Sequence, residues 1–323
     1  MKNDNIKNTV TVIGGGLGGL FVAAFLSKEG YRVTVLEKNK IIGGGLQTFY
    51  SHGISFETGM HLLGGMREGG ALNKICRYLG IYDKIDICDT DHDCMDQITY
   101  FSDGKTYRVP EGREAFAEYF ATEFPSERDN IYAYVDAIYK MVDEIDFFYL
   151  RPDNEHVYTH SEEFMCYMNP MFGGVKGKTP TYIHALINVL YLDGPSRFAV
   201  NSQQMADALA EIICENGGAV IGGDKVVGID IADKMITALH TQHGNMYSSD
   251  YYISAIHPLE MLKMTDSKAF SKAFRDRIAE APNSYSSFCA YFIFKPDSFP
   301  FINHTCYCQQ DYGKVWNYAE YDT

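Results

Sequence analysis

The stretch Thr9–Lys38, TVTVIGGGLGGLFVAAFLSKEGYRVTVLEK, decides the expected fold of this chain. It begins with a β-branched run, Thr9–Ile13, which predicts a strand. A glycine-rich turn, Gly14–Gly19, follows, and then an apolar helical segment that ends at Gly30. Tyr31–Leu36 supplies the next strand. This order predicts a βαβ unit and a parallel sheet.

The glycine turn has the spacing of a dinucleotide-binding fingerprint, G-x-G-x-x-G. Gly14 allows a tight turn, Gly16 lets a pyrophosphate approach the backbone, and Gly19 lets the helix pack close to the sheet. The helix start offers free N–H groups and the positive end of the helix dipole to the phosphates. We therefore expect cofactor contacts along the turn, at Gly14, Gly16, Leu17, Gly18 and Gly19.

An acidic residue completes the fingerprint. Glu37 lies 18 residues after Gly19, close to the spacing of about 20 at which a carboxylate reaches a ribose hydroxyl. We expect it, with the adjacent Lys38, at the adenosine end of the cofactor. A βαβ unit without a ligand is one alternative. A signal peptide or membrane anchor is another, but five glycines within six residues disfavour a spanning helix, and no small-residue cleavage site follows.

Composition narrows the class of protein further. At 323 residues the chain is long enough for two domains. Its net charge of -14 argues against nucleic acid as a partner. The eight cysteines form no C-x-x-C pair, so we expect reduced thiols, a cytoplasmic location and no metal site.

A second glycine cluster, Gly43–Gly45, follows the predicted ribose acid and leads into Thr48-Phe49. A plain nicotinamide dehydrogenase does not require it. In flavin enzymes of the glutathione-reductase type, a double-glycine turn at this place passes beside the extended cofactor. The cluster therefore shifts the expected cofactor from NAD to FAD.

The next segment carries a family resemblance. Gly43-Gly44 with Thr48-Phe49, and then Phe56-Glu-Thr-Gly-Met-His61, resemble the FAD-dependent phytoene desaturase, carotenoid isomerase and retinol saturase group. The wider group often has arginine after the double glycine, where this chain has Gly45. That departure favours the retinol saturase branch over an amine oxidase or a desaturase.

The resemblance implies further site residues. Gly44, Gly45 and Thr48 would line the pyrophosphate–ribityl region, and the turn Gly59, Met60, His61 would lie near the isoalloxazine ring. A strand in Val226–Ile229 would place the backbone of Val227 near the adenine. His61 is the one candidate for a catalytic role in proton transfer; the alternative is a histidine that is merely hydrogen-bonded.

Periodic patterns predict the remaining elements. Helices are expected at 71–79, 111–124, 127–150, 181–191, 203–216 (capped by Ser202) and 268–281, a hairpin at 100–109, strands at 219–221, 225–231, 235–240, 247–254 and 287–295, and a loop at 169–180. The helix 127–150 ends on Phe-Phe-Tyr-Leu. This aromatic end suits a core stripe, a wall of a lipophilic channel, or a lip that contacts a membrane peripherally.

The expected fold class is α/β: a Rossmann FAD-binding domain of the glutathione-reductase type with a discontinuous α+β substrate domain. Residues 1–70 plus 198–260 are assigned to the FAD-binding domain, and 71–197 plus 261–323 to the substrate domain. Family members run further than Thr323. The resemblance therefore implies a chain that lacks the family's final glycine-rich segment and holds its flavin less tightly.

The resemblance implies an FAD-dependent oxidoreductase acting on a hydrophobic polyene or isoprenoid-like small molecule, by desaturation, saturation or isomerisation. Such chemistry belongs mainly to the flavin, so the absence of a Ser/His/Asp set does not count against it. An amine-oxidase or protoporphyrinogen-oxidase-like flavoenzyme is the second hypothesis. A truncated, non-catalytic binding protein is the third. The oligomeric state is left open.

Overall fold

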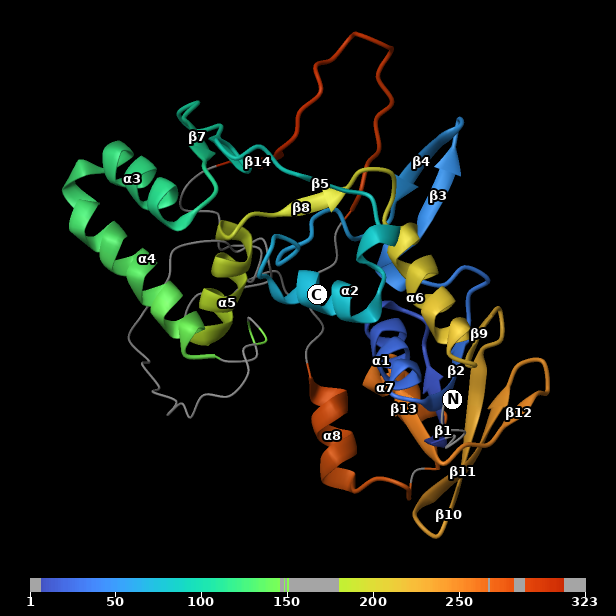
Figure 1. Cartoon of the computed structure of the whole chain (residues 1–323). Coiled ribbons are helices and arrows are strands. Elements are labelled where there is room, and N and C mark those ends of the chain that lie inside the picture. Colours follow the sequence, from blue (N-terminus) through green and yellow to red (C-terminus); the bar gives the residue numbers. More distant parts are fainter. Residues whose placement is uncertain are drawn as a thin grey trace, which may run out of the picture. The chain divides into compact units, whose positions relative to one another are not determined.

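The computed structural model describes residues 7–145, 148, 150, 180–266, 268–281 and 288–310. It divides into two compact units, each assembled from several segments of the chain (Figure 1). The first unit comprises Met1–His61, Cys76–Asp86 and Phe198–Asn283, and the second comprises Leu62–Ile75, Ile87–Arg197 and Ser284–Thr323.

A four-stranded parallel sheet forms the centre of the first unit. Its order is β13 (Tyr251–Ser254), β1 (Lys7–Ile13), β2 (Tyr31–Glu37), β9 (Ala219–Gly222). Val12 pairs with Val35 on one side and Ile253 on the other. The valines of β1 and β2 are almost fully buried, as expected for strands covered on both faces. The predicted βαβ unit is confirmed.

Two helices pack together beside this sheet: α1 (Leu17–Lys28) and α6 (Gln203–Glu215). Small residues of α1 and aliphatic residues of α6 are buried here: Ala23, Ala24, Met205, Leu209 and Ile213. α6 begins where we predicted, with Ser202 at the N-cap position, but the Ser202 side chain makes no capping hydrogen bond. Its hydroxyl donates to the carbonyl of Leu46 at 2.8 Å instead.

The first unit also contains a three-stranded antiparallel sheet of β10 (Val226–Ala232), β11 (Met235–Thr241) and β12 (Met246–Tyr247). Its remaining elements are short: η1 (Gly44–Leu46), β3 (Thr48–Ser51), β4 (Ile54–Glu57), η2 (Tyr82–Lys84), α7 (Pro258–Lys263) and α8 (Lys272–Glu280). The predicted start of α8 at 268 is wrong. Ser271 caps the helix by accepting a hydrogen bond from the N–H of Phe274, so the helix begins at Lys272.

The second unit packs helices on a small sheet. The sheet has the order β14 (Thr305–Gln309), β6 (Asp96–Tyr100), β7 (Thr106–Val109), and the helices are α3 (Arg113–Glu123), α4 (Arg128–Asp143) and α5 (Thr181–Leu192). Their shared core includes Val109, Phe116, Ile138 and Val189. A two-stranded sheet, β5 (Ile87–Asp89) with β8 (Ser196–Phe198), and the short helix η3 (Pro125–Glu127) complete the set. Helix α2 (Ala71–Leu79) contributes residues to both units.

Two predicted elements in this unit are wrong, one in its length and one in its existence. α4 ends at Asp143 rather than at 150; Glu144 is its C-cap residue and donates its N–H to the carbonyl of Lys140 at 3.2 Å. Residues 288–295 form no strand; the strand of this region is β14, which pairs in parallel with β6. Residues 169–179 of the predicted loop, and residues 147 and 149 of the aromatic end, lie outside the described residues.

No helix in the described ranges is both long enough and apolar enough to cross a membrane.

Candidate functional site

The turn between β1 and α1 is built from glycines that leave no room for side chains. Gly14 has a φ of 106°, and a Cβ on it would lie 2.8 Å from Cγ2 of Ile256. A Cβ on Gly19 would overlap the carbonyl oxygen of Gly14. Because these two residues lack side chains, the start of α1 can lie close to the ends of β1 and β13. Both glycines are therefore needed for the fold itself.

Two other glycines of the same turn face open space. A Cβ on Gly16 or on Gly18 would meet nothing within 4 Å. Gly16 is the N-cap residue of α1, no side chain caps this helix end, and its first turn contains no acidic residue. The N–H groups at the helix start therefore keep their capacity to bind an anion. This open helix start fits a pyrophosphate.

Glu37 is buried at the end of β2, with 7% of its surface exposed. One carboxylate oxygen accepts from the N–H of Gly15 at 2.8 Å and the other from the N–H of Asn39 at 2.9 Å. Each oxygen has a further lone pair, so the carboxylate can still accept ribose hydroxyls. The adjacent Lys38 is exposed.

Gly15 is a residue that the fingerprint analysis missed. A Cβ on it would lie 2.9 Å from Cβ of Glu37. Only glycine therefore lets the backbone N–H approach the carboxylate. The available signal was the uninterrupted run Gly14–Gly16, which exceeds what the G-x-G-x-x-G pattern requires.

The second glycine cluster lies directly on the first. The N–H of Gly43 donates to the carbonyl of Gly15 at 2.7 Å, and Gly43 also forms a bridge with Gly16. Gly44 has a φ of 59°, and a Cβ on it would lie 3.1 Å from Cα of Gly16. The residues between Glu37 and Gly45 thus return to the turn that follows β1.

A third segment continues this stack. The N–H of Met60 donates to the carbonyl of Gly45 at 3.0 Å, and a Cβ on Gly59 would lie 3.1 Å from the same oxygen. Thr48 is buried at the start of β3. His61 is more than half exposed, and its Nδ1 lies 3.5 Å from a carboxylate oxygen of Glu57. Three glycine-containing segments therefore form one continuous backbone surface.

Val227 makes no direct contact with the three glycine segments among the hydrogen bonds described above. Its side chain is about half exposed, whereas Val226 is buried with Ile13 and Leu36. The N–H of Asp224 donates to the carbonyl of Glu37 at 3.0 Å, which places the approach to β10 beside the end of β2. A position of Val227 beside the adenine stays a prediction, as do the cofactor contacts of the other site residues and the catalytic role of His61.

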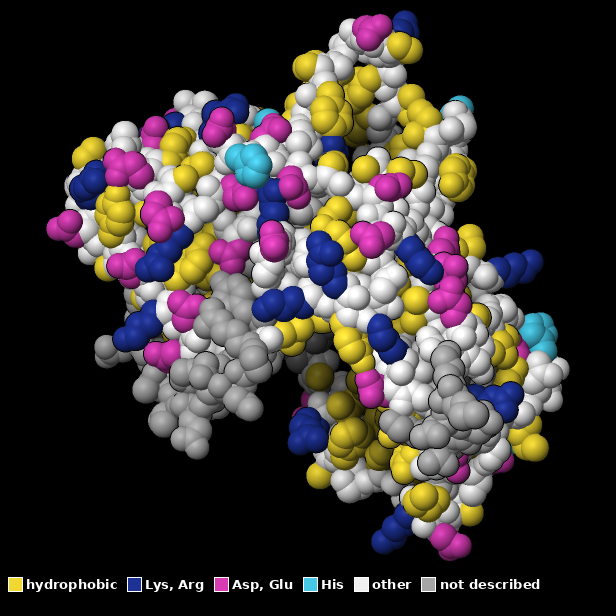
Figure 2. Space-filling view, in the orientation of Figure 1, with side chains coloured by type: hydrophobic (Ala, Val, Ile, Leu, Met, Phe, Trp, Pro, Cys, Tyr) yellow, Lys and Arg dark blue, Asp and Glu magenta, His cyan; other side chains and the backbone are white. Residues whose placement is uncertain are grey.

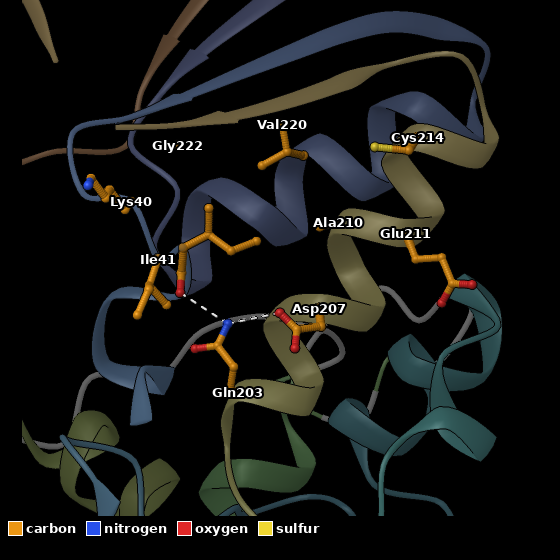
Figure 3. Close-up of a pocket in the computed structure, with 10 residues that line it drawn as sticks. Lys40, Ile41, Gln203, Asp207, Ala210, Glu211, Cys214, Val220 and Gly222 are labelled. Carbon is orange, nitrogen blue, oxygen red and sulfur yellow. Dashed lines mark hydrogen bonds between the residues drawn. The ribbon is translucent and has the colours of Figure 1, made fainter. Parts of the chain in front are cut away.

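A separate groove of about 530 Å³ lies between α6, β9 and the segment that joins Glu37 to Gly43 (Figure 3). The amide nitrogen of Gln203 donates to Asp207 at 2.9 Å and to the carbonyl of Ile42 at 3.3 Å, as Figure 3 shows. None of the lining residues is a predicted cofactor contact. The groove is lined by Lys40, Ile41, Ile42, Gln203, Asp207, Ala210, Glu211, Cys214, Val220 and Gly222.

Burial shifts the pKa of two titratable groups in the second unit, the buried Asp96 and the partly buried His184. Burial raises the pKa of Asp96 in β6 to about 6, opposed in part by a hydrogen bond from Thr305. Burial lowers the pKa of His184 in α5 to about 4. Nε2 of His184 lies 3.0 Å from the hydroxyl of Tyr134 and 3.0 Å from the amide nitrogen of Asn188.

Comparison with known proteins defines the class. Residues 12–79 match the NAD(P)-binding Rossmann-like domain family. The crystal structure of a fatty acid isomerase from P. acnes that produces CLA has a TM-score of 0.55, with 17% identity over 85% of this chain and 64% of that one. The predicted α/β fold class is confirmed, and with it a dinucleotide-binding domain at the N-terminal end of the chain.

The particular relatives are oxidoreductases and isomerases. All-trans-retinol 13,14-reductase of Homo sapiens is 51% identical over 63 residues, which are 20% of this chain and 10% of that protein. Prolycopene isomerase 2 of an Oncidium hybrid is 30% identical over 155 residues, 47% of this chain and 26% of that protein. Probable polyamine oxidase 4 of Arabidopsis thaliana is 40% identical over 80 residues, which are 25% of this chain and 16% of that protein.

Phytoene desaturases match in the same way. The predicted resemblance to the retinol saturase, carotenoid isomerase and phytoene desaturase group is therefore confirmed. The matched parts span a quarter or less of most of these relatives.

Proposed function

We propose that this chain is an FAD-dependent oxidoreductase that acts on carbon–carbon bonds of a hydrophobic polyene or isoprenoid-like small molecule. The observation that carries the proposal is the continuous surface formed by Gly14–Gly19, Gly43–Gly45 and Gly59–Met60. A nicotinamide dinucleotide needs only the first of these segments. The relatives named for retinol, prolycopene and phytoene supply the substrate class.

The residues present fit an extended flavin cofactor. The open helix start at Gly16 would hold the pyrophosphate, Glu37 the adenosine ribose, and Gly44, Gly45 and Thr48 the region between them and the ring. Met60 and His61 would lie towards the ring itself. The bound flavin would supply hydride exchange at N5. The protein's own part is to bind, to orient the substrate and to exclude water.

The visible absorption spectrum of the purified chain, before and after incubation with FAD, tests the cofactor. Flavin bands that stay with the protein through gel filtration support the proposal, and a colourless protein that takes up no FAD contradicts it. Under anaerobic conditions, an isoprenoid that the chain desaturates should bleach the oxidised flavin, and a retinoid or carotenoid that it saturates should restore the colour of the reduced flavin. Bleaching by amines alone would favour the amine-oxidase alternative instead.

Gly16→Val offers a sharper test, because a Cβ at this position meets nothing in the protein. The added side chain would lie where the pyrophosphate is expected. We expect retained FAD to fall to background while the unfolding temperature of the cofactor-free protein stays unchanged. Wild-type FAD content in this variant would show that the pyrophosphate lies elsewhere.

A further inference from the structure

The second unit carries an aromatic arm, which we define as residues 291–302, that no strand or helix of the described residues includes. The chain reverses within it at a turn, Lys295–Ser298, where the N–H and the hydroxyl of Ser298 both donate to the carbonyl of Lys295. Behind the turn, the rings of Phe294 and Phe299 stack at 4.8 Å between centroids and 15° between planes. The stacked pair holds the two limbs of the arm together.

Four phenylalanines of the arm are exposed to a degree that is unusual for a folded protein. Phe292 is 75% exposed, Phe294 58%, Phe299 53% and Phe301 78%. Figure 2 shows hydrophobic side chains gathered over this excursion, with a basic and an acidic side chain at its end. Exposed apolar surface on this scale marks an interaction site.

The charge of the arm restricts what covers it. Residues 291–302 contain one cation, Lys295, and one anion, Asp297, whereas the chain as a whole carries -14. The arm itself is therefore neutral, so two copies of this acidic chain can meet there without bringing net like charges together. Arg197 adds a cation beside it, 4.8 Å from the centroid of the Phe301 ring. In a two-fold symmetric contact, Lys295 of one copy can also face Asp297 of the other.

The area also fits a second copy. Because a phenylalanine buries about 150–250 Å² when it is fully covered, covering these partly exposed rings on two copies removes about 1,000 Å² from water. Full coverage of these rings alone thus reaches the lower limit of roughly 1,000 Å² for a specific interface. A lipid surface fits less well. The charged turn lies at the tip of the arm, so it would have to enter the bilayer before the phenylalanines could.

We infer that the aromatic arm is a homodimer interface, in which the phenylalanine faces of two copies of this chain pack on one another around a two-fold axis. The inference is independent of the proposed function, because the arm includes no predicted cofactor residue.

Sedimentation velocity of the full chain at micromolar concentration tests this inference. The wild type should sediment as a dimer, and Phe292→Ser with Phe301→Ser should raise the dissociation constant by at least tenfold with unchanged circular dichroism. The matched control changes two methionines of similar exposure in the first unit, Met235→Ser with Met246→Ser. This control should remain dimeric.

The charged turn provides a test that leaves the phenylalanines intact. Lys295→Asp places like charges opposite one another and should weaken the dimer, and adding Asp297→Lys should restore it. A monomeric wild type would overturn the inference. A monomer that floats with phosphatidylcholine vesicles would replace the second copy by a lipid surface. A dimer that survives the phenylalanine changes would place the interface elsewhere.

Discussion

The buried carboxylates of Glu37 in the first unit and Asp96 in the second have different hydrogen-bond environments. Glu37 and Asp96 are 7% and 8% exposed. Both oxygens of Glu37 accept backbone N–H groups, whereas Oδ1 of Asp96 has no hydrogen-bond partner among the described residues. Two backbone N–H groups compensate the burial of Glu37, whereas the unpartnered oxygen of Asp96 costs folding free energy.

The largest loss of stability is expected from a substitution at Gly19. This residue packs on Gly14, in the same turn whose Gly15 N–H donates to Glu37. Gly19→Ala places a Cβ against the carbonyl oxygen of Gly14 and should destabilise the chain by about 4 kcal/mol. The control is Gly18→Ala in the same turn, where a Cβ has open space and a gain of roughly 0.5 kcal/mol is expected from helix propensity. Urea unfolding measures both. Equal stability of the two variants would disprove the close approach of α1 to β1.

Glu37→Gln asks whether the backbone donors need a carboxylate. A glutamine can accept from one of the two N–H groups but presents its own NH₂ to the other, so a loss of about 2–3 kcal/mol is expected. The matched control is Glu260→Gln, which breaks an exposed pair with Lys263 and should leave the free energy of unfolding nearly unchanged. If both variants unfold alike in urea, the two hydrogen bonds to Glu37 contribute nothing to stability.

These contrasts also show what the sequence could predict. The βαβ unit was predictable because strand, turn, helix and acid follow one another within Thr9–Lys38, and local chemistry determines each step. The sequence placed Gly44 and Gly45 only along the expected cofactor; that Gly43–Gly45 packs on the first turn was not predicted. The role of Gly15 and the bond from Ser202 to Leu46 were missed, since both depend on contacts made only in the folded chain.

The second unit was less predictable for the same reason. β14 pairs with β6 across about two hundred residues, and no local pattern specifies that pairing. Residues 288–295 have the apolar composition of a strand but find no partner strand among the described residues. β-propensity reflects packing against neighbours more than the backbone itself, so composition alone misplaced this strand. The burial of Asp96 follows from the face that β6 turns to the core.

Asp96→Asn tests the unsatisfied carboxylate directly. Burial raises the pKa of Asp96 from 3.8 to about 6, so the protonated form is favoured in the folded state. The stability that it contributes is present below about pH 4 and is lost as the pH rises through about 6. At pH 7 the asparagine variant should therefore be more stable by about 2 kcal/mol.

The pH dependence separates this charge effect from altered packing. Denaturant unfolding of Asp96→Asn and the wild type should give converging free energies as the pH approaches 3.5. A constant difference at every pH would show that burial of the charge is not the cause.

The smallest change in stability is expected from His184, and its dependence on pH runs in the opposite direction to that of Asp96. Burial lowers its pKa from 6.5 to about 4, so the folded state favours the neutral ring, whose Nε2 faces Tyr134 and Asn188. The stability from this group is present above about pH 6.5 and is lost as the pH falls through about 4. We expect a loss of about 1 kcal/mol, because the ring keeps some contact with water.

His184→Gln can still accept at this place without titrating, so the difference in unfolding free energy between wild type and variant should change between pH 7 and 4. A difference that stays flat over this range would mean that His184 titrates alike in the folded and unfolded chain.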